Sequence, residues 1–151
     1  MNDLSRIELA SGMPSSVAQA FARAQMIFTE RQVSNAINRL AVELTICLQD
    51  QNPIFLSVMQ GGLYLSGQLM QRVVFPLQLG YVDFVINATD SAKDEPKINA
   101  RHPTLDGRVV VTINDVLDED SNITGLNSWV LAAGASTAYS VVLGDRQNTE
   151  L

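Results

Sequence analysis

The stretch VVVTINDVLDEDSNI, from Val109 to Ile123, decides how the rest of the chain is interpreted. Its first five residues have the β-branched, apolar composition of a buried strand. Polar residues begin at Asn114-Asp115, and after two apolar residues three consecutive acids follow at positions 118 to 120. This arrangement places four carboxylates behind one strand. Either a cationic or hydroxyl-rich ligand binds there, or the chain makes an acidic turn.

The composition fits a single globular domain. The chain has 151 residues, of which 46% are hydrophobic and 17% are charged, which is enough for one core. Its net charge of -6 argues against binding to a nucleic-acid backbone, which needs concentrated Lys and Arg. No apolar run reaches the roughly 18–20 residues of a membrane span. The N-terminal residues carry acids and are short of apolar length, so we do not expect a secretory signal.

Several single residues that could belong to a site are expected to have ordinary structural roles. Cys47 is the only cysteine, which excludes an internal disulfide or a cysteine-based metal site and fits a reducing cytoplasm. We expect it to be a small buried residue beside an apolar helix face. His102 has no second histidine nearby and is expected at the surface. Trp129 is expected to pack in the core or against a subunit, and Met59 and Met70 are expected to fill the core.

Helices and strands alternate along the chain. A helix is predicted within residues 13–28, after Pro14. A clearer one over 29–50 starts with a capping box between Thr29 and Gln32. Apolar residues at 33, 37, 40, 44 and 48 give that second helix one buried face. The remaining predicted elements are a strand at 54–59, a turn at 60–62, a helix at 63–74, an extended segment at 77–86, a long polar excursion with room for a hairpin at 87–108, a strand at 109–113, a helix at 123–133 and a strand at 138–143.

This alternation predicts an α/β fold with a central, mainly parallel sheet flanked by helices. We expect one domain overall, with an N-terminal arm or helix over residues 1–28 and a core domain over residues 29–151. Ligands of such sheets bind outside the carboxyl ends of the strands. Two polar turns are predicted at those ends, at residues 60–62 and 114–122. Chemistry is therefore expected there.

Three segments, in this order, resemble one known family. They are NPIFLSVMQGGLYLSGQLMQRVVFPLQLGYVDFV, TINDVLDEDSNI preceded by LDGRVVV, and AAGASTAYSVVLGDRQ. The first resembles the strand, Gly-Gly pyrophosphate turn, helix and strand of the purine phosphoribosyltransferases of the hypoxanthine-guanine type. The second resembles the phosphoribosyl-pyrophosphate loop of that family, and the third resembles the strand leading to its base-contacting lysine. The resemblance covers roughly Thr29 to Gln147.

The resemblance assigns a role to each matching position. It implies that Asn114 and Asp115 hold the ribose hydroxyls, with Asp115 also a weak candidate for contact with Mg²⁺. It implies that Asp118 exchanges a proton with the purine and that Arg146 recognises the base. The positions that it assigns to the phosphates are Glu119, Asp120, Ser121 and Asn122 for the 5′-phosphate, and Gln60, Gly61 and Gly62 for pyrophosphate.

The chain departs from the family pattern at several of these positions. Gln60 replaces a lysine, Asn114 replaces a carboxylate and Asn122 replaces a threonine. Asp120 replaces the glycine of the phosphate cradle, which adds a negative charge and a Cβ where the backbone approaches a phosphate. No segment matches the family's flexible-loop Ser-Tyr pair. The chain stops at Leu151, before the aromatic residue and the aspartate of the family pattern, so we expect a truncated C-terminus and a reduced hood.

The resemblance implies transfer of a 5-phosphoribosyl group from phosphoribosyl pyrophosphate to hypoxanthine or guanine, with Mg²⁺ as cofactor, in purine salvage. A homo-oligomer is expected because an uncovered edge strand favours self-association. Two alternatives stay open. The chain is a catalytically impaired descendant that binds nucleotides or acts in assembly, or it is an unrelated acidic α/β domain that binds Mg²⁺ through Asp115 and Asp118.

Overall fold

A computed structural model describes residues 12–85, 97–117 and 123–146 of the chain. By its internal contacts the chain divides into two compact units, residues 1–34 and 35–151. The expected division into an arm over 1–28 and a core over 29–151 stays a prediction. Within the described ranges, no helix is both long enough and apolar enough to cross a membrane.

The first unit contains the helix α1 (Ser15–Arg23) and the start of α2 (Glu30–Leu48). The carbonyl of Pro14 accepts the N–H groups of Val17 and Ala18, which begins α1 one residue after the proline. The predicted capping box is confirmed: the Thr29 N–H donates to Gln32 Oε1 at 2.8 Å, and the Gln32 N–H donates to Thr29 Oγ1 at 3.3 Å. Two N–H groups without partners inside the helix are thereby satisfied.

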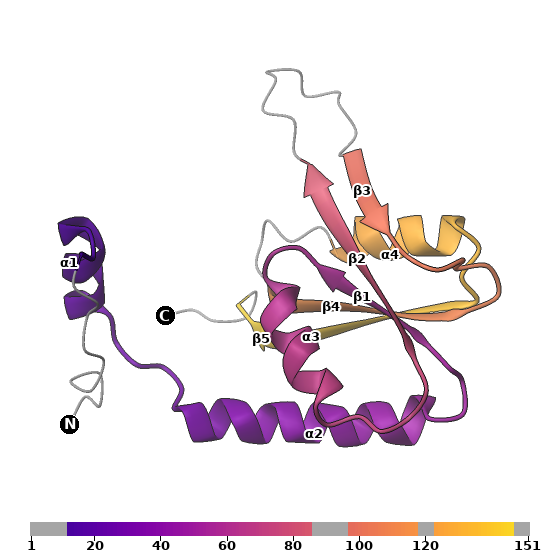
Figure 1. Cartoon of the computed structure of the whole chain (residues 1–151), viewed down its shortest axis with the longest axis horizontal. Helices are drawn as coiled ribbons and strands as arrows, with labels where there is room; N and C mark the ends of the chain where they lie inside the picture. Colours follow the sequence, from indigo (N-terminus) through magenta and orange to yellow (C-terminus); the bar gives the residue numbers. More distant parts are fainter. Residues whose placement is uncertain (1–11, 86–96, 118–122, 147–151) are drawn as a thin grey trace. The chain divides into compact units, whose positions relative to one another are not determined.

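The second unit is built on a five-stranded sheet with the strand order β3-β2-β1-β4-β5 (Figure 1). The strands are β1 (Ile54–Val58), β2 (Gln78–Val85), β3 (Lys97–Arg101), β4 (Val109–Leu117) and β5 (Thr137–Asp145). Three of the four pairings are parallel, and only β2 and β3 run antiparallel. The mainly parallel α/β fold is therefore confirmed. The hairpin expected within residues 87–108 is different: only β3 lies in that segment, and it pairs with β2, which precedes it.

Helices cover both faces of this sheet. The helix α3 (Gly62–Met70) follows β1 and packs against β1 and β4, whereas α4 (Ile123–Ala132) follows β4 and packs against β4 and β5. Since β2 and β5 lie on opposite sides of the β1–β4 pair, right-handed crossovers put α3 and α4 on opposite faces. Figure 1 shows this arrangement, with α4 on one side of the sheet and α3 on the other.

The core on the α4 face is a cluster of buried aliphatic side chains. Alternate residues of β1 contribute to it, as expected for a strand with a period of two. Trp129 packs against its edge, which confirms the expected packing role. The buried members of the cluster are Ile54, Leu56, Val58, Val82, Leu105, Val110, Leu126, Val130 and Ala135.

Two expectations about single residues are wrong, and a third, for His102, is met only in part. Cys47 is exposed, because the buried face of α2 consists of Ile37, Ala41, Leu44 and Leu48 and does not include Cys47. Met70 is 40% exposed and does not fill the core. His102 is half-buried, and its ring meets that of Trp129 edge-on with centroids 5.5 Å apart.

Candidate functional site

Three of the predicted segments meet at one edge of the sheet. β1, β4 and β5 are mutually parallel, so their carboxyl ends lie on the same side. The Gln60–Gly62 turn follows β1, and Arg146 follows β5. The Arg146 N–H donates to the carbonyl of Leu117 at 2.8 Å, which holds the Arg146 backbone beside the last residue of β4.

β4 runs further than the sequence predicts. The expected strand ended at Ile113, but β4 continues to Leu117. Tertiary pairing causes the extension, because Asn114, Val116 and Leu117 stand opposite Val142, Gly144 and Asp145 of β5. The polar pair Asn114-Asp115 therefore lies inside a strand and has a fixed backbone, where a turn was expected.

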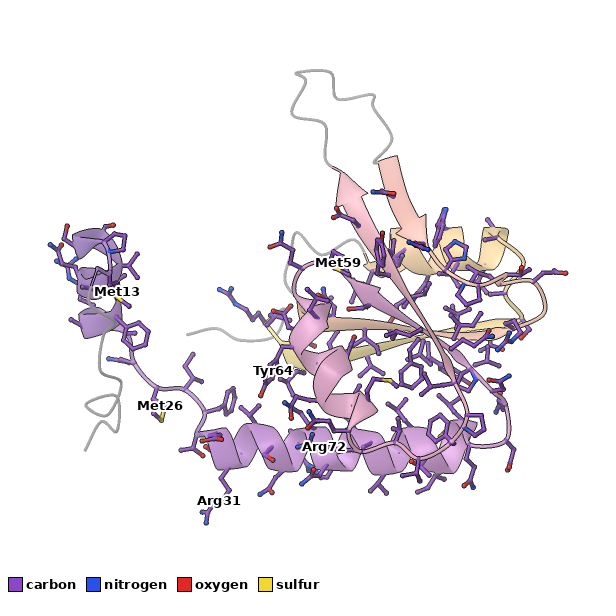
Figure 2. The ribbon with its side chains drawn as sticks, in the orientation of Figure 1. Met13, Met26, Arg31, Met59, Tyr64 and Arg72 are labelled. Atoms are coloured by element: carbon purple, nitrogen blue, oxygen red, sulfur yellow. The ribbon has the colours of Figure 1, made fainter. Side chains whose placement is uncertain are left out.

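The two glycines after β1 lie directly against this polar pair. A Cβ built on Gly61 would collide with the Asp115 carboxylate and would come within 2.9 Å of Asn114 Oδ1. A Cβ on Gly62 would collide with the carbonyl oxygen of Ile113. Only glycine allows the start of α3 to approach β4 so closely. The Met59–Gln60 peptide that leads into this turn is cis, and Met59 lies at the end of β1 beside α3 (Figure 2).

Local hydrogen bonds orient the polar pair. Asn114 Oδ1 accepts the N–H of Asp115 at 3.0 Å, and Asn114 Nδ2 donates to the carbonyl of Val116 at 3.3 Å. Asp115 Oδ1 accepts the Val116 N–H at 2.8 Å. Both side chains are half-buried. An ionised carboxylate has about four acceptor positions, so Asp115 can still accept hydrogen bonds from a ligand.

A chain of polar side chains ties α4 to the same strands. Thr112 Oγ1 and Ser140 Oγ are 2.9 Å apart, and Ser140 Oγ donates to Asn127 Oδ1 at 3.1 Å. Thr112, two residues before Asn114 along the chain, is 2% exposed, so the Thr112–Ser140 hydrogen bond involves a buried hydroxyl. The contact fixes α4 against β4 and β5 close to the edge where the site lies.

The structure brings part of the predicted site together. Gly61, Gly62, Asn114 and Asp115 lie close together, and Gln60 is an exposed residue of the same turn. The expected roles of Asp118, Glu119, Asp120, Ser121 and Asn122 fall on residues outside the described ranges. Ser57 was missed by the sequence analysis: its Oγ is 3.2 Å from a Cβ position on Gly62. A serine inside an otherwise apolar strand was the available signal.

The described residues offer few metal ligands. Within them, no group of three or more His, Cys, Asp or Glu side chains is placed to hold a metal ion. Asp115 contributes one carboxylate and Asn114 one amide oxygen, both hard oxygen ligands. Mg²⁺ commonly binds through one or two carboxylates, several waters and the phosphates of a substrate. The residues present thus fit a metal that arrives with its phosphate ligand, and they do not form a cage of their own.

Comparison with known proteins bears out the resemblance. A bifunctional protein TilS/HprT of Listeria monocytogenes serotype 4b is 24% identical over 124 residues, covering 81% of this chain and 19% of the relative. The chain therefore spans about a fifth of that protein's length. The hypoxanthine-guanine phosphoribosyltransferase of Bacillus subtilis is 23% identical over 124 residues, covering 81% of this chain and 69% of the relative. No protein-family model matches the chain.

Solved structures agree on the fold. A hypoxanthine phosphoribosyltransferase from Staphylococcus aureus, in a tetragonal crystal, superposes with a TM-score of 0.74 at 19% identity, covering 90% of this chain and 74% of that one. The Bacillus subtilis relative and the structural neighbour belong by name to the family that the three sequence segments resemble. The predicted resemblance to purine phosphoribosyltransferases of the hypoxanthine-guanine type, and their fold, are confirmed.

Proposed function

We propose that this chain, as a relative of the purine phosphoribosyltransferases, transfers a 5-phosphoribosyl group from phosphoribosyl pyrophosphate to hypoxanthine or guanine in purine salvage. The observation that carries the proposal is the contact between the Gly61-Gly62 turn and the Asn114-Asp115 pair at the carboxyl edge of the sheet. A phosphate group and a ribose bound at adjacent positions need adjacent backbone and carboxylate sites. This edge supplies both.

The turn suits the leaving pyrophosphate. The N–H groups at the N-terminus of a helix favour an anion, and α3 begins at Gly62. Glycines leave those groups open to close approach by phosphate oxygens. Gln60 offers an amide N–H where the family has a lysine, so the turn lacks a positive charge at this position. We expect weaker pyrophosphate binding for that reason.

Asp115 suits the ribose. Its carboxylate is half-buried and held by the Val116 N–H, so it is oriented before a ligand arrives. A carboxylate accepts strong hydrogen bonds from sugar hydroxyls. Positive charge develops on the ribose as pyrophosphate leaves, and a fixed negative group beside the sugar favours that state. Bound Mg²⁺ would supply neutralisation of the phosphate charges.

The remaining roles rest on the resemblance. We assign the 5′-phosphate to residues 119–122 and proton exchange with the purine to Asp118. Arg146 is assigned to the base because its backbone is held beside Leu117, two residues beyond Asp115. A guanidinium group can donate to an exocyclic oxygen of the base, as an ammonium group would.

A second candidate is a catalytically impaired protein that binds nucleotides or acts in assembly. The geometry of Asn114 favours it. Both ends of the Asn114 amide are used in local bonds to the Asp115 N–H and the Val116 carbonyl. An amide used in this way stabilises the strand and supplies no negative charge to the transition state. The site would then bind a nucleotide without promoting transfer.

The proposal also covers the cellular location and the oligomeric state of the protein. The single cysteine is the reason for placing the chain in the cytoplasm. β3 and β5 are the terminal strands of the described sheet, and such strands favour association with a second copy. We therefore expect a homo-oligomer, which analytical ultracentrifugation over a range of concentrations would detect.

The direct test combines binding with turnover. Thermal shift is measured with phosphoribosyl pyrophosphate, IMP and GMP, each with and without Mg²⁺, and IMP formation is followed by absorbance. A ligand at 100 times its dissociation constant adds about 2.7 kcal/mol to the stability. Binding together with product formation supports the transferase, and binding alone supports the impaired form. Absence of both contradicts the transferase and the nucleotide-binding form of the second candidate, and leaves a role in assembly.

A companion experiment tests two positions at which the chain departs from the family pattern. The double variant Asn114→Asp, Asp120→Gly restores the family residues at both positions. If the wild-type chain binds nucleotide but is inactive, turnover by the double variant would show that these two residues cause the loss. Continued inactivity would assign the loss to other parts of the chain.

A further inference from the structure

An apolar seam lies along the solvent-exposed side of α3. Its residues are spaced by four, three and four positions, a spacing that aligns side chains along one side of a helix. Helical hydrogen bonding continues beyond the end of α3, because the Val73 N–H donates to the carbonyl of Leu69. We call this set of residues the α3 seam, and it consists of Leu63, Gly67, Met70 and Val74.

The α3 seam is exposed although it is apolar. Leu63 is 52% exposed, Met70 is 40% exposed and Val74 is 92% exposed, and the neighbouring Tyr64 is 58% exposed. The opposite side of α3 is already buried against β1 and β4. A helix at the surface of a monomer normally carries charged and polar residues on its outer side, but α3 contains no charged residue. The outer side of α3 therefore has the composition of a covered surface.

The α3 seam is part of a larger apolar patch. Leu63 and Met70 line one hollow together with Leu79 and Tyr81 of β2, which are themselves exposed. The exposed apolar surface of the whole patch is on the order of 500 Å², a size that marks an interaction site. We call it the α3–β2 patch, and its large side chains are Leu63, Tyr64, Met70, Val74, Leu79 and Tyr81.

The size of the α3–β2 patch matches what a stable dimer needs. A standard protein interface buries about 800 Å² on each partner, of which a little more than half is apolar. The patch supplies an apolar area of that order. The exposed glutamine side chains around it, Gln60, Gln71 and Gln78, provide a polar and uncharged rim.

The charge distribution favours a second copy of the chain as the partner. The net charge is -6, so two copies repel each other wherever their acidic surfaces meet. From Gln51 to Val82 the only charged residue is Arg72, whose side chain donates to Asn38 and Gln68. Among the described residues that line the hollow, only Arg101 is charged. Two copies can therefore meet here without bringing acids together, whereas a partner recognised by opposite charge finds little to bind.

From these observations we infer that the α3–β2 patch is the contact surface between two copies of this chain. The same patch serves on both copies, as in a two-fold dimer, so the α3 seam of one copy packs on the α3 seam of the other. Side chains of the second copy have room beside Gly67, where a Cβ would meet nothing within 4 Å.

This contact is separate from the terminal strands β3 and β5, and it does not depend on transferase activity. The α3 seam begins at Leu63, directly after Gly62. Packing of the two seams would therefore also hold the start of α3, which lies against β4.

The test measures the association of the whole chain by analytical ultracentrifugation over a range of concentrations. We expect the wild-type chain to form a dimer. Met70→Glu and Val74→Glu should each weaken dimerisation by about tenfold or more, because the contact would bury an unpaired carboxylate. Both positions are exposed in the single chain, so the far-ultraviolet circular dichroism of each variant should match that of the wild type.

A matched control makes the same change outside the patch. Ile46 of α2 is 72% exposed, and Ile46→Glu adds the same negative charge at the same cost in exposed apolar surface. Dimerisation of the Ile46→Glu variant should equal that of the wild-type chain.

Three results would overturn the inference. A chain that is monomeric at every concentration would leave the α3–β2 patch to a different partner. A dimer that survives both Met70→Glu and Val74→Glu would have its contact elsewhere, for example at the sheet edges. Equal weakening by Ile46→Glu would show that the added charge acts on the whole molecule and not on this surface.

Discussion

Gly61 and Asp115 lie so close together that no side chain larger than hydrogen fits between them. A Cβ on Gly61 would collide with the Asp115 Oδ1 atom and lie 2.7 Å from its carboxyl carbon. The two residues are 54 positions apart in the sequence: Gly61 lies in the turn after β1, and Asp115 lies near the end of β4. Their contact joins the proposed pyrophosphate site to the proposed ribose site, and the first two predictions test it.

Substitution of Gly61 by alanine should damage both stability and binding. The added methyl group must displace the Asp115 carboxylate or the start of α3, and such overpacking costs about 1–3 kcal/mol. Thermal melting followed by circular dichroism measures the first effect, and the stabilisation produced by IMP measures the second. Gly67→Ala is the matched control, because its Cβ meets nothing and should raise the stability by about 1 kcal/mol. Equal melting temperatures for the two variants would contradict the close approach of Gly61 to Asp115.

Asp115→Asn should weaken nucleotide binding while leaving the fold intact. Asparagine keeps an oxygen that can accept the Val116 N–H, so the local bond survives. The negative charge is lost, and hydrogen bonds to charged groups are worth about 1.5–3 kcal/mol. We expect the dissociation constant of IMP to rise by about ten- to a hundredfold, as measured by isothermal titration. Asp50→Asn, at an exposed position, should change nothing, and a similar loss there would show a general charge effect.

Leu69→Ala should destabilise the chain strongly. Leu69 is 0% exposed and anchors α3 to the sheet, so its truncation leaves a cavity that costs about 2–5 kcal/mol. Urea denaturation of the purified chain measures the change. Leu63, on the same helix, is 52% exposed, and Leu63→Ala should cost well under half as much. Comparable losses of stability at the two positions would mean that α3 presents a different face to the sheet.

Thr29→Ala should weaken the start of α2. It removes one half of the capping box and costs about 1 kcal/mol. Faster amide exchange in the first turn of the helix is the expected sign. Thr45→Ala makes the same chemical change in the interior of α2, where Thr45 Oγ1 donates to the Ala41 carbonyl. This control should slow the amide exchange of α2 slightly, because alanine favours the helix. Exchange that is unaffected by Thr29→Ala would show that the box contributes no stability.

The sequence by itself determined the local features of this protein. The Thr29 and Gln32 pair fixed the start of α2, because a capping box needs only residues three apart. The alternation of apolar strands with helices determined the mainly parallel sheet, and parallel strands determined that residues 60–62 and Asn114 share one edge. Arg146 was assigned to the site by the family resemblance alone. The three motifs in order were also sufficient to identify the family resemblance.

Tertiary structure decided the features that depend on distant partners. β4 extends through Asn114-Asp115 only because β5 pairs with it, and no local preference of those polar residues predicts a strand. Cys47 is exposed because the rotation of α2 is set by the surface that it covers. The approach of Gly61 to Asp115 and the open space beside Gly67 are products of how α3 packs on the sheet. Packing of side chains from separate segments is a property of the whole fold, so neither could be predicted from the chain alone.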